Sequence, residues 1–215
     1  MIGKLIFKQE VAKNVLEVKF FMPDEFVFEA GQYIQLVLAE NLKHYFSITN
    51  SPNEKNTLRI STRLSESEFK NKLQSLPLGS EVQINGPWGD FVLNKKIRSY
   101  FFVAGGIGIT PFMSMLRYIR EEKLPITIRL FWVNHSADFP PYLEELQSLE
   151  KNHSNFELIL ESRPLLRIPM GQEIGVEREL FYIAGPPAFV SQIIHALQAQ
   201  GIESQNIITD SFTGY

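Results

Sequence analysis

The hydrophobic pattern of this chain changes its rhythm near residue 95. Over the first ninety or so residues, short runs alternate apolar and polar side chains, as half-buried strands do. One segment, 66–76, instead places Phe69 and Leu73 four residues apart, which is helical spacing. Several short strands with one small helix predict an antiparallel barrel. The predicted strands cover 4–8, 15–21, 32–38, 45–48, 58–63 and 81–84.

Beyond residue 95 the pattern favours an α/β domain. Short apolar runs, typical of buried strands, alternate there with segments of helical periodicity. Such alternation predicts a parallel sheet covered by helices. We therefore expect two domains, a barrel over 1–95 and an α/β domain over 96–215. The expected strands are 100–104, 126–133, 156–160, 180–184 and 206–209, and the expected helices begin at Pro111, Tyr142 and Pro187.

Composition narrows the classes of function. The chain has 215 residues, a net charge of −3 and no cysteine. The missing cysteines exclude disulfides, a thiolate nucleophile and a cysteine-ligated iron–sulfur cluster. No basic face for nucleic acid is evident, and the histidines show no metal-ligand spacing. The first ten residues are charged and strand-like rather than a signal peptide, so we expect a cytoplasmic protein without a membrane partner.

A glycine-rich turn marks the first strand-to-helix junction of the second half. Gly105, Gly106 and Gly108 separate an apolar strand from a helix that starts with Thr110 and Pro111. Glycines let backbone N–H groups approach a ligand, and a helix N-terminus favours negative charge, so the turn is a candidate phosphate cradle. Close packing alone also explains such glycines.

The uncharged run 99–116 has the length of a membrane span, but its glycines and proline favour a strand and a helix.

The order of short motifs along nearly the whole chain resembles the ferredoxin–NADP⁺ reductase family of flavoproteins. The motifs are Phe-Glu-Ala-Gly-Gln-Tyr at 28–33, His-Tyr-Phe-Ser at 44–47, Gly-Pro-Trp-Gly-Asp-Phe at 86–91, the glycine turn from 105, and Ala-Gly-Pro-Pro at 184–187. The resemblance implies a flavin-binding barrel followed by a nucleotide-binding α/β domain. It also implies that NAD(P)H reduces bound FAD, with FMN the less favoured flavin, and that a separate acceptor then takes the electrons.

On the flavin side, the resemblance implies a role for the 44–47 motif. Ser47 matches the serine near flavin N5, and Phe46 takes the position of a tyrosine that packs on the flavin ring. His44 replaces the arginine that pairs with a flavin phosphate and cannot form a bidentate fork. We therefore expect Arg63 to compensate, with Ser65 at the N-terminus of the next helix.

On the nucleotide side, the resemblance implies that Thr110 and Pro111 face the nicotinamide. Ala184 stands where the family often has a cysteine, and Ser162 with Arg163 favours NADPH. An aromatic near the end of the chain is expected to shield the flavin. The implied catalytic residues are Ser47, Thr110 and Tyr215; the implied cofactor contacts are His44, Tyr45, Phe46, Ser47, Ile48, Arg63, Ser65, Gly105, Gly106, Gly108, Thr110, Pro111, Ser162, Arg163, Gly185, Pro186, Phe212 and Tyr215.

The electron acceptor stays open. It is a ferredoxin, a flavodoxin, another protein component or a small molecule, and scattered lysines such as Lys43, Lys70 and Lys95 are available for an acidic partner. A flavin or ferric reductase with loosely bound flavin is the first alternative. The departures at His44, Phe46 and Ala184 also leave room for a non-catalytic binding or regulatory subunit.

Overall fold

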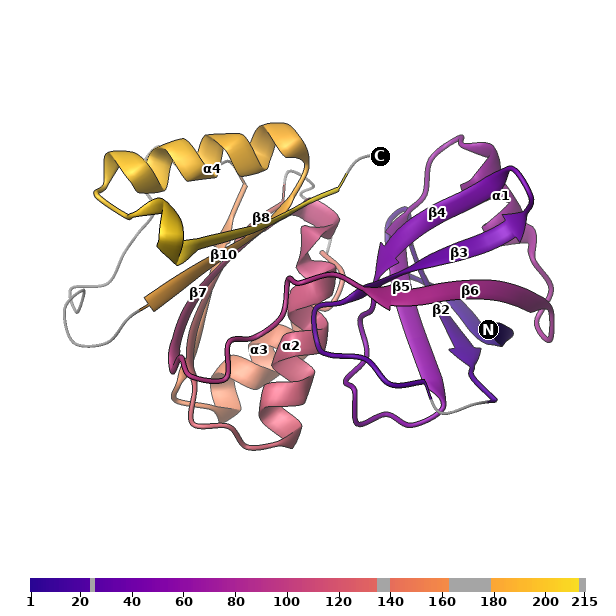
Figure 1. Ribbon diagram of the computed structural model, residues 1–215, viewed down its shortest axis with the longest axis horizontal. Helices are drawn as coiled ribbons and strands as arrows, with labels where there is room; N and C mark the ends of the chain where they lie inside the picture. The colour runs from indigo at the N-terminus through magenta and orange to yellow at the C-terminus, as the bar shows by residue number, and fades with distance from the viewer. Residues whose placement is uncertain (24–25, 135–139, 163–178, 213–215) are drawn as a thin grey trace. The chain divides into compact units, whose positions relative to one another are not determined.

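The computed structural model describes residues 1–23, 26–134, 140–162 and 179–212 (Figure 1). Its contacts divide the chain into two compact units. The first unit contains residues 1–93 together with 110–123. The second contains 94–109 and the described residues from 124 to 212.

A six-stranded antiparallel sheet forms the first unit. Its strands lie in the order β4-β3-β6-β1-β2-β5, and a bridge between Ile48 and Ile60 joins the end of β4 to β5. This bridge brings the two edge strands together, so the sheet closes into the predicted barrel. The strands are β1 (Ile2–Ala12), β2 (Val15–Phe21), β3 (Tyr33–Ala39), β4 (Leu42–Ser47), β5 (Thr57–Arg63) and β6 (Glu81–Trp88).

The barrel core follows from alternation along these strands. In β3, for example, Ile34 and Leu36 are fully buried while their neighbours are half-exposed. Helix α1 (Glu68–Ser75) contributes Phe69 and Leu73 to the same core, as their spacing predicts. It begins two residues later than expected, because the Ser67 hydroxyl caps it by accepting a hydrogen bond from the backbone N–H of Lys70 at 3.3 Å.

Helix α2 (Thr110–Glu121) belongs to the first unit by its contacts. Its Phe112 ring lies 5.7 Å from the ring of Phe91, in an edge-on arrangement. A side chain at Gly31 would lie 2.5 Å from the Cε of Met115, so that glycine lets α2 approach the barrel. The predicted division at residue 95 assigns this helix to the second domain, whereas its packing partners are barrel residues.

A five-stranded parallel sheet forms the second unit. Its strand order is β11-β10-β7-β8-β9, and every neighbouring pair is parallel. The strands are β7 (Ser99–Gly105), β8 (Thr127–Val133), β9 (Phe156–Glu161), β10 (Glu179–Gly185) and β11 (Ile207–Ser211). The helices are α3 (Leu143–Asn152) and α4 (Pro187–Ala199), with single 3₁₀ turns at Gly106–Ile109 and Ser204–Asn206. The predicted two-domain fold is thus confirmed.

Burial in the second unit matches the apolar character of its strands. Helix α4 packs the predicted stripe of Val190, Ile193 and Leu197 against one face of the sheet. Leu143, Leu146 and Leu149 lie on one stripe of α3, as their spacing predicts, with Leu146 fully buried and the other two half-buried.

Gly108 offers a test of how tightly this sheet edge is packed. A Cβ at Gly108 would lie 2.3 Å from the carbonyl oxygen of Ala184, which is backbone and has no rotamer to change. We expect Gly108→Ala to lower the free energy of unfolding by about 1–3 kcal/mol, measured by urea denaturation. The control is Gly201→Ala, where no atom lies within 4 Å and only the φ of +86° opposes a side chain. A Gly108→Ala variant as stable as the parent would contradict this packing.

Candidate functional site

The segment that ends β4 divides its side chains between two faces. His44 and Phe46 lie on one face, where their rings contact each other at 5.0 Å and both contact Phe69 of α1, at 5.5 and 5.6 Å. Tyr45 lies on the other face, 57% exposed, beside Tyr33. Of the aromatics in this motif, Phe46 is therefore a core residue and Tyr45 a surface residue.

The hydroxyl of Ser47 is one of four side-chain polar atoms in the described residues that are buried and unpaired. The residue is 4% exposed, and its Oγ has no hydrogen-bond partner among the described residues. Buried polar atoms in native proteins almost always have a partner, so an orphaned hydroxyl points to a missing ligand. The flavin contact expected of Ser47 fits this hydroxyl. Ile48, also an expected contact, is fully buried and bridges to Ile60, so its side chain serves the barrel core.

Three basic side chains gather beside this strand. Burial, and then the charge of Lys70, lowers the pKa of His44; burial, and then the charge of Arg63, lowers the pKa of Lys70. Lys70 is only 4% exposed, yet no carboxylate of the described residues forms an ion pair with any of the three. Uncompensated cations around the first turn of a helix suit a bound anion.

Lys70 is the residue that sequence reasoning missed. The sequence suggests only one of several scattered lysines available to an acidic partner, and the structure buries Lys70 at the third helical position, next to His44. The signal was available in Ser67, whose side chain caps α1 and thereby fixes where Lys70 lies. Ser65 is exposed and does not cap the helix.

The glycine turn is held in place by the ring of Phe189 and by a hydrogen bond from Trp132. A Cβ at Gly105 would meet the ring of Phe189 at 2.6 Å, and one at Gly185 would meet it at 2.9 Å. The indole N–H of Trp132 donates to the carbonyl oxygen of Gly106 at 2.9 Å, and Gly106 itself has a φ of +54°. The packing explanation therefore holds for Gly105 and Gly185, and the backbone of the turn is rigidly placed.

The turn and the loop after β10 meet where the sheet reverses its strand order. From β7 the chain proceeds to β8 and β9 on one side of β7, and β10 and β11 then lie on its other side. Gly108 contacts the end of β10. Ligands of open parallel sheets bind at such a switch point, outside the carboxyl ends of the strands. Pro186 precedes α4 there, and Phe212 donates its backbone N–H to the carbonyl oxygen of Gly185 at 3.0 Å.

The remaining predicted site residues are distributed as follows. Thr110 and Pro111 are buried at the start of α2, in the same compact unit as Ser47. Ser162 is exposed just after β9. Arg163 and Tyr215 lie outside the described residues.

Two family models match the chain in the order that the two sheets predict. Residues 3–93 match an oxidoreductase FAD-binding domain, and residues 102–164 match an oxidoreductase NAD-binding domain. Together they span most of the chain. The chain belongs to the ferredoxin–NADP⁺ reductase-like family of flavoproteins.

Individual relatives agree with this assignment. The propane 2-monooxygenase reductase component of Mycolicibacterium goodii is 24% identical over 92% of this chain and 63% of its own length. The phthalate dioxygenase reductase of Burkholderia cepacia is 28% identical over 68% of this chain and 47% of its own length. The chain thus spans about half to two thirds of these curated relatives. The fold also matches the H286L mutant of Plasmodium falciparum ferredoxin–NADP⁺ reductase, with a TM-score of 0.81, 15% identity and coverage of 98% of this chain and 95% of that one.

Within the described ranges, no helix is both long and apolar enough to cross a membrane. In the same ranges, no three His, Asp or Glu side chains come together as a metal site.

The lowered pKa of His44 predicts how flavin binding responds to pH. A phosphate bound beside His44 and Lys70 would raise the pKa of the imidazole, so binding would take up a proton. We expect FAD affinity, measured by fluorescence titration, to rise as the pH falls from about 7.5 to about 5.5. His44→Gln should flatten this dependence, whereas the control His195→Gln, at an exposed position, should retain it. An unchanged slope in His44→Gln would contradict the assignment.

Asp210 predicts a second pH dependence, in the stability of the flavin-free protein. Burial at the end of β11 raises the pKa of Asp210 from 3.8 to about 6. Between these values the native state binds the proton more tightly than the unfolded chain, so stability falls as the pH rises through this window. We expect Asp210→Asn to raise the melting temperature at pH 7.5 and to leave it nearly unchanged at pH 4. Asp90→Asn, at an exposed position, is the control, and a gain independent of pH would argue against a buried charge.

Proposed function

We propose that this chain is an NAD(P)H-dependent flavoprotein reductase: it takes a hydride from NAD(P)H onto a bound FAD and passes the electrons to a separate acceptor. The observation that carries the proposal is the buried, unpaired hydroxyl of Ser47, which lies in the part of the chain matched by the FAD-binding domain. A bound flavin supplies a centre that accepts electrons in pairs and releases them singly or in pairs.

The barrel supplies the flavin contacts in this proposal. The Ser47 hydroxyl donates a hydrogen bond to the flavin ring, and the side chains of Lys70, Arg63 and His44 neutralise its phosphates. Lys70 thereby does much of what the family's arginine does at the position of His44. The further proposed contacts are Tyr45, Phe46, Ile48 and Ser65.

The second half supplies the nucleotide contacts. We propose that the turn at 105–108 and the Gly185–Pro186 loop bind NAD(P)H at the switch point, with Thr110 and Pro111 facing the nicotinamide. Phe212, Ser162, Arg163 and Tyr215 complete the proposed set, and Ser162 with Arg163 favours NADPH. The domain boundaries 1–95 and 96–215 and a cytoplasmic location also stay proposals.

The proposed acceptor is another component of an oxygenase system. The names of the two curated relatives, a propane 2-monooxygenase reductase component and a phthalate dioxygenase reductase, support this choice. The alternative, a reductase that releases flavin as a product, is favoured only if the flavin dissociates at each turnover.

An anaerobic titration tests the proposal. The purified protein is loaded with FAD, separated from free flavin, and mixed in turn with NADPH and NADH while the visible flavin band is followed. We expect bleaching by at least one nucleotide, and the faster donor identifies the preferred one. A protein that binds no FAD, or whose bound FAD neither nucleotide reduces, would overturn the proposal and favour the regulatory-subunit alternative.

Lys70 provides the sharpest test of how the flavin is held. Removing its charge with Lys70→Gln should weaken FAD binding about tenfold or more, since a charge-assisted hydrogen bond contributes about 1.5–3 kcal/mol. Lys72→Gln, on the exposed side of the same helix, is the matched control and should bind FAD like the parent. Equal affinities for the parent and Lys70→Gln, by equilibrium dialysis, would exclude Lys70 from the site. Arg63→Ala tests the companion residue in the same way.

A further inference from the structure

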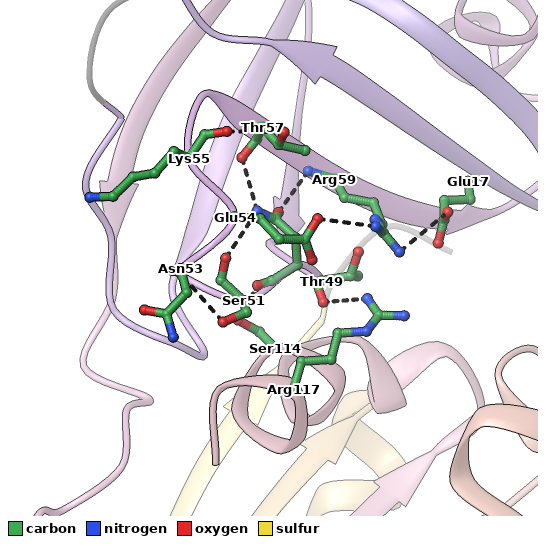
Figure 2. A network of polar contacts seen from close by, with 11 residues as sticks. Glu17, Thr49, Ser51, Asn53, Glu54, Lys55, Thr57, Arg59, Ser114 and Arg117 are labelled. Atoms are coloured by element: carbon green, nitrogen blue, oxygen red, sulfur yellow. Dashed lines mark hydrogen bonds and ion pairs between the residues drawn. The ribbon is translucent and has the colours of Figure 1, made fainter. Parts of the chain in front are cut away.

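Helix α2 is hydrogen-bonded to the segment that directly follows Ser47. The Ser114 hydroxyl donates to the carbonyl oxygen of Asn50 at 2.7 Å, and the Arg117 guanidinium donates to the carbonyl oxygen of Thr49 at 2.6 Å (Figure 2). Both donors are buried: Ser114 is 0% and Arg117 6% exposed. A charged, buried donor to a main-chain carbonyl is among the stronger hydrogen bonds a protein makes.

The segment that receives these bonds is itself fixed to the barrel. The Asn50 side chain donates to the carbonyl oxygen of Thr57 at 2.9 Å and accepts from the backbone N–H of Arg59 at 2.8 Å. The backbone N–H of Thr49 donates to the carbonyl oxygen of Arg59 at 2.9 Å. Thr57 and Arg59 both belong to β5, so these bonds converge on that strand. Arg59 is also paired to Glu54, at 3.2 Å (Figure 2). Through Thr49 and Asn50, α2 is therefore tied to β5, and through two residues of chain to Ser47 at the end of β4.

Helical geometry places Thr110 on the same side of α2 as the two donors. Residues at i, i+4 and i+7 share one face of a helix, and Thr110, Ser114 and Arg117 have this spacing. All three are buried, whereas Arg120, nearly one turn beyond Arg117, is exposed. Thr110 is about 10 Å along the helix axis from Arg117. The face of α2 that is hydrogen-bonded to the barrel therefore also carries Thr110, the residue assigned to the nicotinamide.

We propose that Arg117 and Ser114 are positioning residues for hydride transfer, which set the place of Thr110 relative to Ser47 by clamping α2 to the segment Ile48–Asn50. The proposal rests on the function proposed above. Neither side chain needs to touch the flavin or the nucleotide. They act by holding the nicotinamide-facing end of α2 and the flavin-facing end of β4 in one hydrogen-bonded body, and hydride transfer is sensitive to displacements of about 1 Å.

Arginine suits this position better than lysine does. Its planar guanidinium carries several N–H donors at fixed angles, whereas a lysine ammonium is a strongly hydrated point charge that is costlier to bury. Arg117→Lys therefore keeps the charge and tests the geometry, and Arg117→Gln removes the charge but keeps a donor. Ser114→Ala deletes a single oxygen from a helix and is the milder second variant.

The first experiment separates positioning from binding. FAD-loaded variants are mixed anaerobically with saturating NADPH or NADH, and the limiting rate of flavin bleaching is compared with the dissociation constants of both ligands. We expect Arg117→Gln to slow bleaching about tenfold or more, and Ser114→Ala to slow it less, with both dissociation constants within about threefold of the parent. Arg120→Gln is the matched control and should bleach at the parental rate. A rate that falls only in step with lost FAD, or does not fall, would overturn the proposal.

The second experiment needs no ligand. Hydrogen–deuterium exchange is measured by mass spectrometry on the flavin-free parent and on Arg117→Gln and Ser114→Ala. We expect faster exchange in Ile48–Asn53 and in the first turns of α2 together, with β1 and β2 unchanged. Faster exchange on only one side would show that the two segments are not one body. If the parent shows this coupling but no nucleotide reduces its flavin, the proposed function fails and the clamp itself stands.

Discussion

The central interaction in this structure is the pair of buried hydrogen bonds that join α2 to the carbonyl oxygens of Thr49 and Asn50. These oxygens lie immediately after Ser47, where β4 has ended and the chain bridges to β5, and they accept buried hydrogen bonds from Arg117 and Ser114. Leaving a buried carbonyl without a donor costs about 1–3 kcal/mol. This constraint explains why α2, which follows a strand of the parallel sheet in sequence, packs with the barrel.

Two kinds of incompleteness mark the barrel as a binding module. The hydroxyl of Ser47 lacks a partner, and the cations of Lys70 and Arg63 lack a carboxylate among the described residues. The Ser47 hydroxyl and the Lys70 ammonium are buried, and burial without a partner is unfavourable for polar and charged groups alike. A ligand with a polar aromatic ring and a phosphate satisfies both at once.

The sequence alone predicted the two-domain fold, because the alternation of apolar and polar residues in strands and their spacing in helices are local signals. It also singled out Ser47 and the glycine turn as candidates, since a motif keeps its order along the chain, and their roles stay predictions. It did not predict the burial of Lys70, because a lysine is normally solvated and only the Ser67 cap fixes its direction. The partnership of α2 with the barrel was equally hidden: Arg117 and Thr49 are 68 residues apart, and no periodicity reports a contact of that range. Arg163 and Tyr215 lie outside the described residues, so their roles stay predictions.

The central claim is that this chain moves a hydride from a nicotinamide to a flavin held at Ser47. The most direct test is a single-turnover, anaerobic comparison of unlabelled nucleotide with nucleotide carrying deuterium in the transferred position, at saturating concentration. The account predicts that the flavin band bleaches measurably more slowly with the deuterated donor, because the C–H bond breaks in the step observed. Equal rates for the two donors, or a flavin band that neither donor changes, would contradict it.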